Sequence, residues 1–349
     1  MTGALKRKYF IVTVDAEGDD QWNPREAAQT LNAAYLPRFQ ALCEKFCFKP
    51  VYLTTYEMAH NPAFIEFVQD RLGEGFCEVG MHLHAWGTPP FHALQHVTDQ
   101  HPYLIEYPYE VMDEKIHAVT SLLEETFARR IVSHRAGRWA IDGRYLELLE
   151  KHGYGVDCSV TPHVDWSGNP GQTGIGGADY SHFPESPYLI RGSILEMPVT
   201  IRRTRRAPPG DVRNRVKSTL FGRTVWMRPS VQCLDDLVHL AQSVANEPNT
   251  DYLQFMIHSS ELMPGGSCYY ASEASVEQLY DSLECLFTVV RQRFAGITLA
   301  GYRDLKLPGC HGGELYEPAQ GSAVEAPAAR PHPVCERLGG LHRNGLQAH

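Results

Sequence analysis

The sequence lacks the features that mark exported, membrane-spanning and dinucleotide-binding chains. Its longest apolar stretch near the start runs only from Tyr9 to Val14, too short for a signal peptide or a bilayer span. None of its nine cysteines forms a Cys-x-x-Cys pair, and an odd number suits free thiols in a reducing compartment. No Gly-x-Gly-x-x-Gly follows the first predicted strand, which removes the main support for a Rossmann-type site. We therefore expect a cytoplasmic protein without a transmembrane segment.

An excess of positive charge is missing as well. Lys and Arg together number 32 against 41 Asp and Glu, which gives a formal net charge of −9. Such a chain has no overall electrostatic attraction for nucleic acid, so we expect a small or carbohydrate substrate instead. The 349 residues, 43% hydrophobic and 21% charged, are typical of a folded chain, and their number suits one α/β barrel with insertions.

Short β-rich runs alternate with helical stretches along the chain, which favours a parallel β/α barrel, closed or nearly closed. Helices are predicted over Glu26–Phe46, behind Asn23 and Pro24, and over Val276–Phe294. Residues 1–310 are predicted to form a single domain, whereas residues 311–349, rich in Gly, Ala and Pro, are predicted to be a disordered tail. The predicted strands are Tyr9–Val14, Val51–Thr54, Cys77–His82, Ile131–His134, Gly155–Ser159, Ile194–Thr200, Tyr252–His258 and Ile297–Ala300.

Three long connections should rise from the carboxyl-terminal rim of the barrel, where barrel active sites lie: Ala85–Pro108, Pro162–Pro187 and Arg202–Pro229. The middle one is glycine-rich and predicts a flexible loop. The last one carries a basic cluster that would contact a phosphate or carboxylate of the substrate, or else form a solvated mobile loop. Its arginines are Arg202, Arg203, Arg205, Arg206, Arg213 and Arg215.

Two carboxylates, Asp15 and Glu17, follow the first predicted strand. Because side chains alternate along an extended chain, both point to one side and Ala16 to the other. Like charges held so close raise one another's pKa or require a cation between them. The alternative is a helix cap or a solvated acidic turn.

Two imidazoles, His82 and His84, end the third predicted strand with the same spacing. They therefore face one side and suit a single metal ion, for which an acid of the first strand would be a third ligand. His92 and His96 are a rival pair, but no strand holds them.

Two further strand ends carry polar side chains. Arg135 follows the fourth predicted strand, where a guanidinium can fix a carboxylate in one rotamer and lower its pKa, or form an exterior ion pair. His258 ends an alternating apolar run, a placement that suits a general acid with a pKa near neutrality.

These segments, in this order, resemble the NodB-homology polysaccharide deacetylases of carbohydrate esterase family four, whose fold is a distorted (β/α)7 barrel. Thr13-Val14-Asp15 matches the first motif, whose aspartate is the general base. Arg135 matches the arginine that positions the base, and Met256-Ile257-His258 is similar to the motif whose histidine is the acid.

The sequence also departs from that family. Ala16 replaces a metal-binding aspartate, and Trp86 stands where the second metal-binding histidine is expected, with His84 nearby. Glu-Gly-Asp after Asp15 and the run His258–Leu262 resemble the WalW-like branch, which is linked to lipopolysaccharide and O-antigen gene clusters.

The resemblance implies a metal-dependent hydrolase that removes an acetyl or formyl group from an amino sugar, whether free or carried by a nucleotide or a lipid. Asp15 would be the base, oriented by Arg135, and His258 the acid. The metal, zinc first and iron, cobalt or manganese otherwise, would be held by His82, His84 and one acid, Glu17 before Asp15. Substrate-binding residues would be Trp86, Arg138, Trp139 and Asp157.

Some alternatives stay open. Asp157 could hold His258 in its charged form, or it could be a turn residue of the core. The chain could be another metal-dependent amidohydrolase, although those barrels carry the His-x-His on strand one. It could also be a non-catalytic saccharide-binding protein, since two motifs are irregular.

Overall fold

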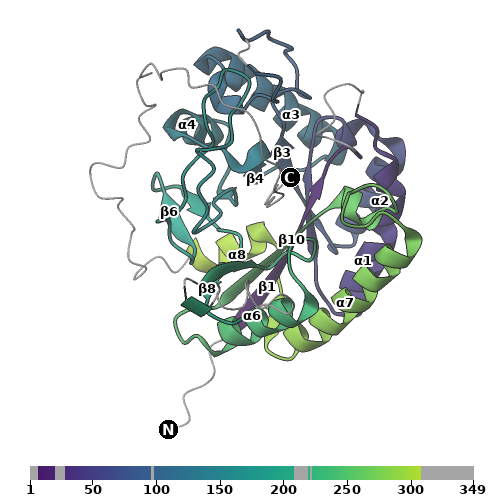
Figure 1. The fold of residues 1–349 in the computed structure, drawn as a ribbon. Coiled ribbons are helices and arrows are strands. Elements are labelled where there is room, and N and C mark those ends of the chain that lie inside the picture. Colours follow the sequence, from purple (N-terminus) through teal and green to yellow (C-terminus); the bar gives the residue numbers. More distant parts are fainter. Residues whose placement is uncertain (1–6, 20–27, 96–97, 208–218, 221, 308–349) are drawn as a thin grey trace, which may run out of the picture. The chain divides into compact units, whose positions relative to one another are not determined.

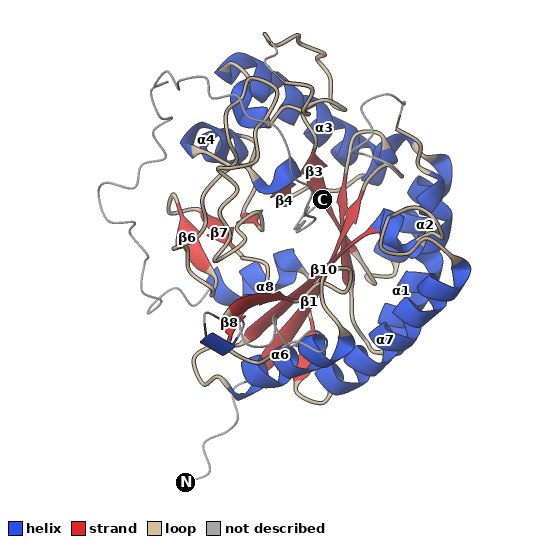
Figure 2. Cartoon of the chain, viewed as in Figure 1, coloured by secondary structure: helices blue, strands red, loops and turns tan. Residues whose placement is uncertain are grey.

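A computed structural model describes residues 7–19, 28–95, 98–207, 219–220 and 222–307. A nine-stranded sheet forms its centre, in the order β10-β1-β2-β3-β4-β5-β7-β6, with β11 paired to β1. All neighbours in this sheet are parallel except β6 and β7. The sheet curls into a half-barrel with helices around its outside, as Figures 1 and 2 show. The predicted distorted (β/α)7-type fold is confirmed.

The strands of this sheet are β1 Lys8–Ala16, β2 Pro50–Thr54, β3 Glu78–Leu83, β4 Ser133–Ala136, β5 Val156–Asp157, β6 Tyr188–Ile190, β7 Ile194–Glu196, β10 Tyr252–His258 and β11 Phe294–Gly296. The main helices are α1 Leu36–Lys45, α2 Pro62–Gly73, α3 Tyr109–Phe127, α4 Gly143–Lys151, α6 Leu234–Asn246, α7 Glu273–Arg291 and α8 Leu299–Lys306. Short 3-10 turns are η1 Leu31–Tyr35, η2 Met58–His60, η3 Leu104–Glu106, η4 Gly137–Trp139 and η5 Ser259–Leu262.

The central strand β1 explains why the polar strand ends meet. It lies between β10 and β2 and is buried along most of its length, which fits its nearly continuous apolar run. Its register pairs Asp15 with His258, and that of β3 pairs His82 with Arg135. Since neighbouring strands are parallel, their carboxyl ends share one edge, and these four side chains start from that edge.

The last predicted strand and the end of the last predicted helix need correction. Ile297–Ala300 is not a strand: β11 ends at Gly296, and Thr298 caps a helix that begins at Leu299. Leu299 and Tyr302 of that helix are buried in the core, a pattern too short to distinguish from a strand. Phe294 belongs to β11 rather than to α7, which ends at Arg291.

The first predicted helix also differs. Residues 28–30 are not helical, and the segment begins as the 3-10 turn η1 before α1. The predicted start of this helix depended on Asn23, Pro24 and Glu26. These three residues lie outside the described residues.

The glycine-rich connection Pro162–Pro187 is more ordered than its composition predicts. Glu106 accepts hydrogen bonds from the backbone N–H groups of Gln172 (3.1 Å) and Thr173 (2.6 Å), which ties the glycine-rich connection to the one after β3. The Arg202–Pro229 connection contains an antiparallel pair, β8 Ile201–Thr204 and β9 Arg223–Trp226.

Part of the basic cluster is paired within the protein. Arg202 lies 3.1 Å from Glu185 and 3.4 Å from Glu247, and Arg206 lies 3.9 Å from Asp236. Arg203 and Arg205 lie in the same described segment, whereas Arg213, Arg215 and residues 311–349 lie outside the described part of the chain. No helix within the described ranges has the length and apolar character needed to cross a bilayer.

Candidate metal centre

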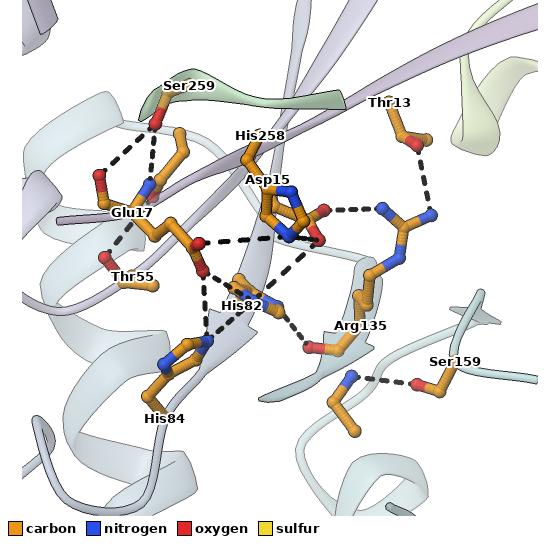
Figure 3. Close-up of polar contacts among 12 residues, drawn as sticks. Thr13, Asp15, Glu17, Thr55, His82, His84, Arg135, Ser159, His258 and Ser259 are labelled. Atoms are coloured by element: carbon orange, nitrogen blue, oxygen red, sulfur yellow. Dashed lines mark hydrogen bonds and ion pairs between the residues drawn. The ribbon is translucent and has the colours of Figure 1, made fainter. Parts of the chain in front are cut away.

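Three buried side chains converge at the carboxyl edge of the sheet: Glu17, His82 and His84. Glu17 Oε2 lies 3.4 Å from His82 Nε2 and 3.2 Å from His84 Nε2, and the two imidazole nitrogens are 2.8 Å apart. The three residues are only 2–3% exposed. Figure 3 shows them pointing toward one another, with Asp15 and His258 beside them. The strand-end spacing predicted this arrangement, because β1 and β3 both deliver alternating side chains to one side.

The hydrogen bonds of His82 favour a metal-binding form of its ring. Its Nδ1 lies 3.0 Å from the carbonyl oxygen of Arg135, which can only accept, so the ring proton belongs on Nδ1. Nε2 then presents a lone pair toward His84 and the carboxylate of Glu17. The two imidazole nitrogens and the carboxylate oxygen lie within 3.4 Å of one another, close enough to bind one cation together. Two imidazoles and one carboxylate are also a donor set found in zinc hydrolases, so the residues fit the ion that the resemblance implies.

A glycine makes room for His84. A Cβ at Gly137 would lie 2.7 Å from His84 Cδ2 and nearer still to the backbone of Leu83. Any larger residue would push the 3-10 turn η4 away from the end of β3. This close approach gives a physical reason for a glycine at this point.

The second carboxylate, Asp15, is held by Arg135. Arg135 Nη1 donates to Asp15 Oδ1 at 2.5 Å, while Nη2 donates to Thr13 Oγ1 at 3.0 Å. Burial raises the pKa of Asp15, but Arg135, with His82 and His258, outweighs it and leaves the pKa below its ordinary value. Asp15 Oδ2 lies 4.0 Å from His82 Nε2, farther than the carboxylate of Glu17. The geometry thus separates the two acids, with Glu17 nearer His82 and His84.

His258 lies across from these residues. Its Nε2 is 3.8 Å from Asp15 Oδ2 and 3.9 Å from Glu17 Oε1. Burial also raises the pKa of Glu17, but His258, His82 and His84 hold it well below the ordinary value. Two ionised carboxylates and three imidazoles therefore share one buried space.

The predicted substrate residues are distributed around this edge. Trp86 is half-buried and stacks on His101, with ring centroids 4.2 Å apart. Arg138 donates to the carbonyl oxygens of His101 and Pro170 and lies 3.9 Å above the ring of Tyr103. Trp139 is buried 5.3 Å from the guanidinium of Arg135.

Of the two alternatives for Asp157, a partner of His258 or a residue of the core, the structure shows the second, and its burial also removes it from the predicted substrate-binding residues. Asp157 Oδ1 lies 2.6 Å from His134 Nδ1 and accepts from Ser159 Oγ at 2.7 Å, on strands away from β10. It is fully buried and has no exposed surface. The carboxylate beside His258 is instead Glu261, paired with Arg228.

Sequence reasoning missed Glu261 and Arg228. The spacing of His258 and Glu261, three residues apart, was visible in the sequence but matched a 3-10 turn that was not predicted. Arg228 had no local signal at all. Of the rival histidine pair, His92 is exposed and His96 lies outside the described residues.

Comparisons with known proteins show likeness of fold. No protein-family model matches the sequence, and no curated protein matches it. A candidate polysaccharide deacetylase from Mycobacterium smegmatis aligns with 13% identity and a TM-score of 0.50, covering 87% of this chain and 92% of that one. A 4-alpha-glucanotransferase from Thermococcus litoralis aligns with 12% identity and a TM-score of 0.52, covering 85% of this chain and 40% of that one.

A candidate polysaccharide deacetylase involved in O-antigen biosynthesis from Bordetella bronchiseptica aligns with 13% identity and a TM-score of 0.37, too low to bear on fold or function. The chain has the fold of the NodB-type polysaccharide deacetylases. A glucanotransferase shares that fold, so the fold alone does not define the reaction.

Proposed function

We propose that the chain is a metal-dependent hydrolase that removes an N-acyl group from an amino sugar during lipopolysaccharide or O-antigen synthesis. The observation that carries the proposal is the convergence of Glu17, His82 and His84 beside a second carboxylate and a third imidazole. These are the parts that hydrolysis of an amide requires: an ion site, a base and an acid.

Glu17, His82 and His84 would hold a divalent ion, zinc in the first place and iron, cobalt or manganese otherwise. When bound, the ion supplies a Lewis acid that polarises the acyl carbonyl and makes water more acidic. The remaining chemistry belongs to side chains of the chain itself.

Asp15 is the proposed base. Arg135 occupies Oδ1, so the carboxylate is fixed with Oδ2 toward His82 and His258. The lowered pKa of Asp15 keeps it ionised at neutral pH and able to take a proton from the attacking water.

His258 is the proposed acid. The water oxygen bonds to the acyl carbon, and the bond from that carbon to the sugar nitrogen breaks. Because an amide nitrogen leaves only when protonated, His258 Nε2 gives it a proton. The products are a carboxylic acid, acetic or formic, and a free amino sugar.

Trp86 is the first of the proposed sugar-contacting residues, and Arg138 and Trp139 are the others. Its ring lies 4.4 Å from that of His84 and is only half-buried, so it offers an apolar face next to the proposed ion site. Sugars commonly pack on such faces through their C–H groups. The substrate is a free, nucleotide-linked or lipid-linked N-acyl amino sugar.

The test compares His82→Ala with His92→Ala. Both remove one imidazole, but His92 is exposed and outside the cluster. Bound metal is measured by elemental analysis, and acid release from N-acetyl and N-formyl amino sugars by mass spectrometry. We expect His82→Ala to lose both metal and hydrolysis and His92→Ala to keep both.

Full metal content and turnover in His82→Ala would contradict the proposal. A wild-type protein that binds saccharide and metal yet releases no acid would instead be a saccharide-binding protein.

A further inference from the structure

A buried ion pair lies directly behind His258. Arg228 Nη2 donates to Glu261 Oε1 at 2.9 Å and lies 3.0 Å from His258 Nδ1, while Glu261 Oε1 lies 3.2 Å from the same nitrogen. Arg228 and Glu261 are each 1% exposed. Burying two charges is costly, and a buried pair often stabilises a protein less than apolar residues would. This pair therefore calls for an explanation beyond stability.

Two separate segments hold the pair in place. Glu261 lies on the 3-10 turn η5, three residues after His258, so both side chains leave the same side of the turn. Arg228 follows β9, where Met227 N–H donates to Thr200 and Met227 O accepts from Met256 N–H. Arg228 Nε also donates to Ser230 Oγ at 2.7 Å. The guanidinium is thus fixed beside β10 by backbone and side-chain bonds.

The chemistry of these atoms restricts where the ring proton lies. Nη2 has two N–H groups, and both Glu261 Oε1 and His258 Nδ1 lie within hydrogen-bonding distance of it. The two bonds form together only when Nδ1 is an acceptor, which leaves the proton of the neutral ring on Nε2. A neutral ring protonated on Nδ1 would donate to Glu261 Oε1 but would lose the bond from Arg228. When the ring carries both protons, Nδ1–H has Glu261 Oε1 as its acceptor and Nε2–H faces Asp15 and Glu17.

Glu261 can accept hydrogen bonds from Arg228 and from the His258 ring because it stays ionised. Burial raises its pKa, but Arg228 and His258 lower it to about 2. It is thus a permanent acceptor and anchors the guanidinium at working pH.

We propose that Arg228 and Glu261 are positioning residues that keep a proton on His258 Nε2 and direct it toward the reacting atoms. The inference rests on the proposed function, in which His258 donates that proton. Holding His258 was one of the two roles that the sequence left open for Asp157, and the inference assigns it to Arg228 and Glu261 instead.

The first test is a double-mutant cycle with Glu261→Gln and His258→Ala in the metal-loaded enzyme. Glu261→Gln is expected to lower kcat about 10- to 100-fold, with KM and metal content unchanged. In the His258→Ala background it should have no further effect, because Glu261 acts through that ring. Glu261→Asp should restore part of the activity.

The matched control is Glu185→Gln. Glu185 also pairs with a histidine and an arginine, lying 2.5 Å from His163 Nε2 and 3.1 Å from Arg202 Nε, but away from the ion site. It should leave kcat unchanged. An equal loss from Glu261→Gln in both backgrounds, or no loss in either, would overturn the inference.

A second measurement does not depend on turnover. Nitrogen-15 NMR of the His258 ring in the wild-type chain should show the neutral ring protonated on Nε2, and Arg228→Met should shift the population toward Nδ1–H. A wild-type ring protonated on Nδ1 would overturn the inference even if hydrolysis is observed. A correct tautomer in a chain that releases no acid would instead contradict the proposed function alone.

Discussion

Two of the buried histidine–carboxylate pairs among the described residues, His134–Asp157 and His258–Glu261, differ in what the second ring nitrogen contacts. His134 on β4 has Nδ1 2.6 Å from Asp157 and Nε2 2.7 Å from the hydroxyl of Tyr145. His258 has a partner behind Nδ1, but its Nε2 faces carboxylates at 3.8 and 3.9 Å. A histidine with both nitrogens committed is part of the core. A histidine with one nitrogen directed at an acidic cluster fits the role proposed for His258.

Alternation of side chains along β4 explains why His134 is confined to the core. His134 points out toward Tyr145 of α4, whereas Arg135, the next residue, points in toward Asp15. Burial lowers the pKa of His134, which Asp157 only partly offsets. His134 and Arg135 are both buried, but only Arg135 reaches the proposed site.

The largest expected effect comes from removing the imidazole of His258, the histidine whose Nε2 faces the acidic cluster. His258→Ala should retain the metal, because Glu17, His82 and His84 remain, while kcat falls about 10²- to 10⁴-fold through loss of the acid. Stopped assays of acid release and elemental analysis of the same sample measure both quantities. Turnover close to that of the wild type would show that another group donates the proton.

Removing the imidazole of His134, the partner of Asp157, should lower the stability of the protein rather than its rate of hydrolysis. His134→Ala leaves the carboxylate of Asp157 buried without its imidazole partner, at a cost of about 3–5 kcal/mol in the free energy of unfolding. Denaturant titration measures this loss, and kcat per folded molecule should stay within about twofold. Replacing Asp157 with Asn in the same chain should recover part of the stability. A kcat loss as large as that of His258→Ala would mean that the two pairs share one role.

The smallest expected effect concerns a third histidine, His101, which stacks on Trp86. Burial, with His84 and Arg138, lowers the pKa of His101 to about 4, so between pH 6.5 and 4 the unfolded chain binds more protons than the folded one. The free energy of unfolding therefore falls as the pH falls through this window. His101→Gln should flatten the pH profile by about 1–2 kcal/mol, after allowance for partial exposure. A profile that keeps its slope in this variant would assign the acid sensitivity to other groups.

Strand ends were the predictable part of the candidate site. Parallel pairing brings the carboxyl ends of neighbouring strands together whatever the sequence between them. The candidate residues lie within the last two residues of a strand or directly after it: Asp15, Glu17, His82, His84, Arg135 and His258. Turn residues were not predictable in the same way. Glu261 lies on a 3-10 turn and Arg228 on a connection, and no periodic pattern fixes their direction.

Capping and local pairing decided the element bounds that sequence patterns placed wrongly. Leu299 follows a short apolar run typical of a strand, yet the hydroxyl of Thr298 accepts from Gly301 N–H and starts a helix. The glycine-rich connection was predicted to be flexible, but Glu106 supplies an acceptor for its backbone from a distant turn. Such contacts depend on residues far apart in the chain.

The sequence by itself determined the barrel class and the set of acids and imidazoles that meet at its edge, because alternation along strands and parallel pairing are local rules. Only the tertiary structure decided which carboxylate lies beside which histidine. That choice depends on distances between segments separated by dozens of residues, where a shift of a few ångströms turns a hydrogen bond into no contact at all. The sequence offered Asp157 as a partner of His258, but the packing of β4, β5 and η5 places Asp157 beside His134 and Glu261 beside His258.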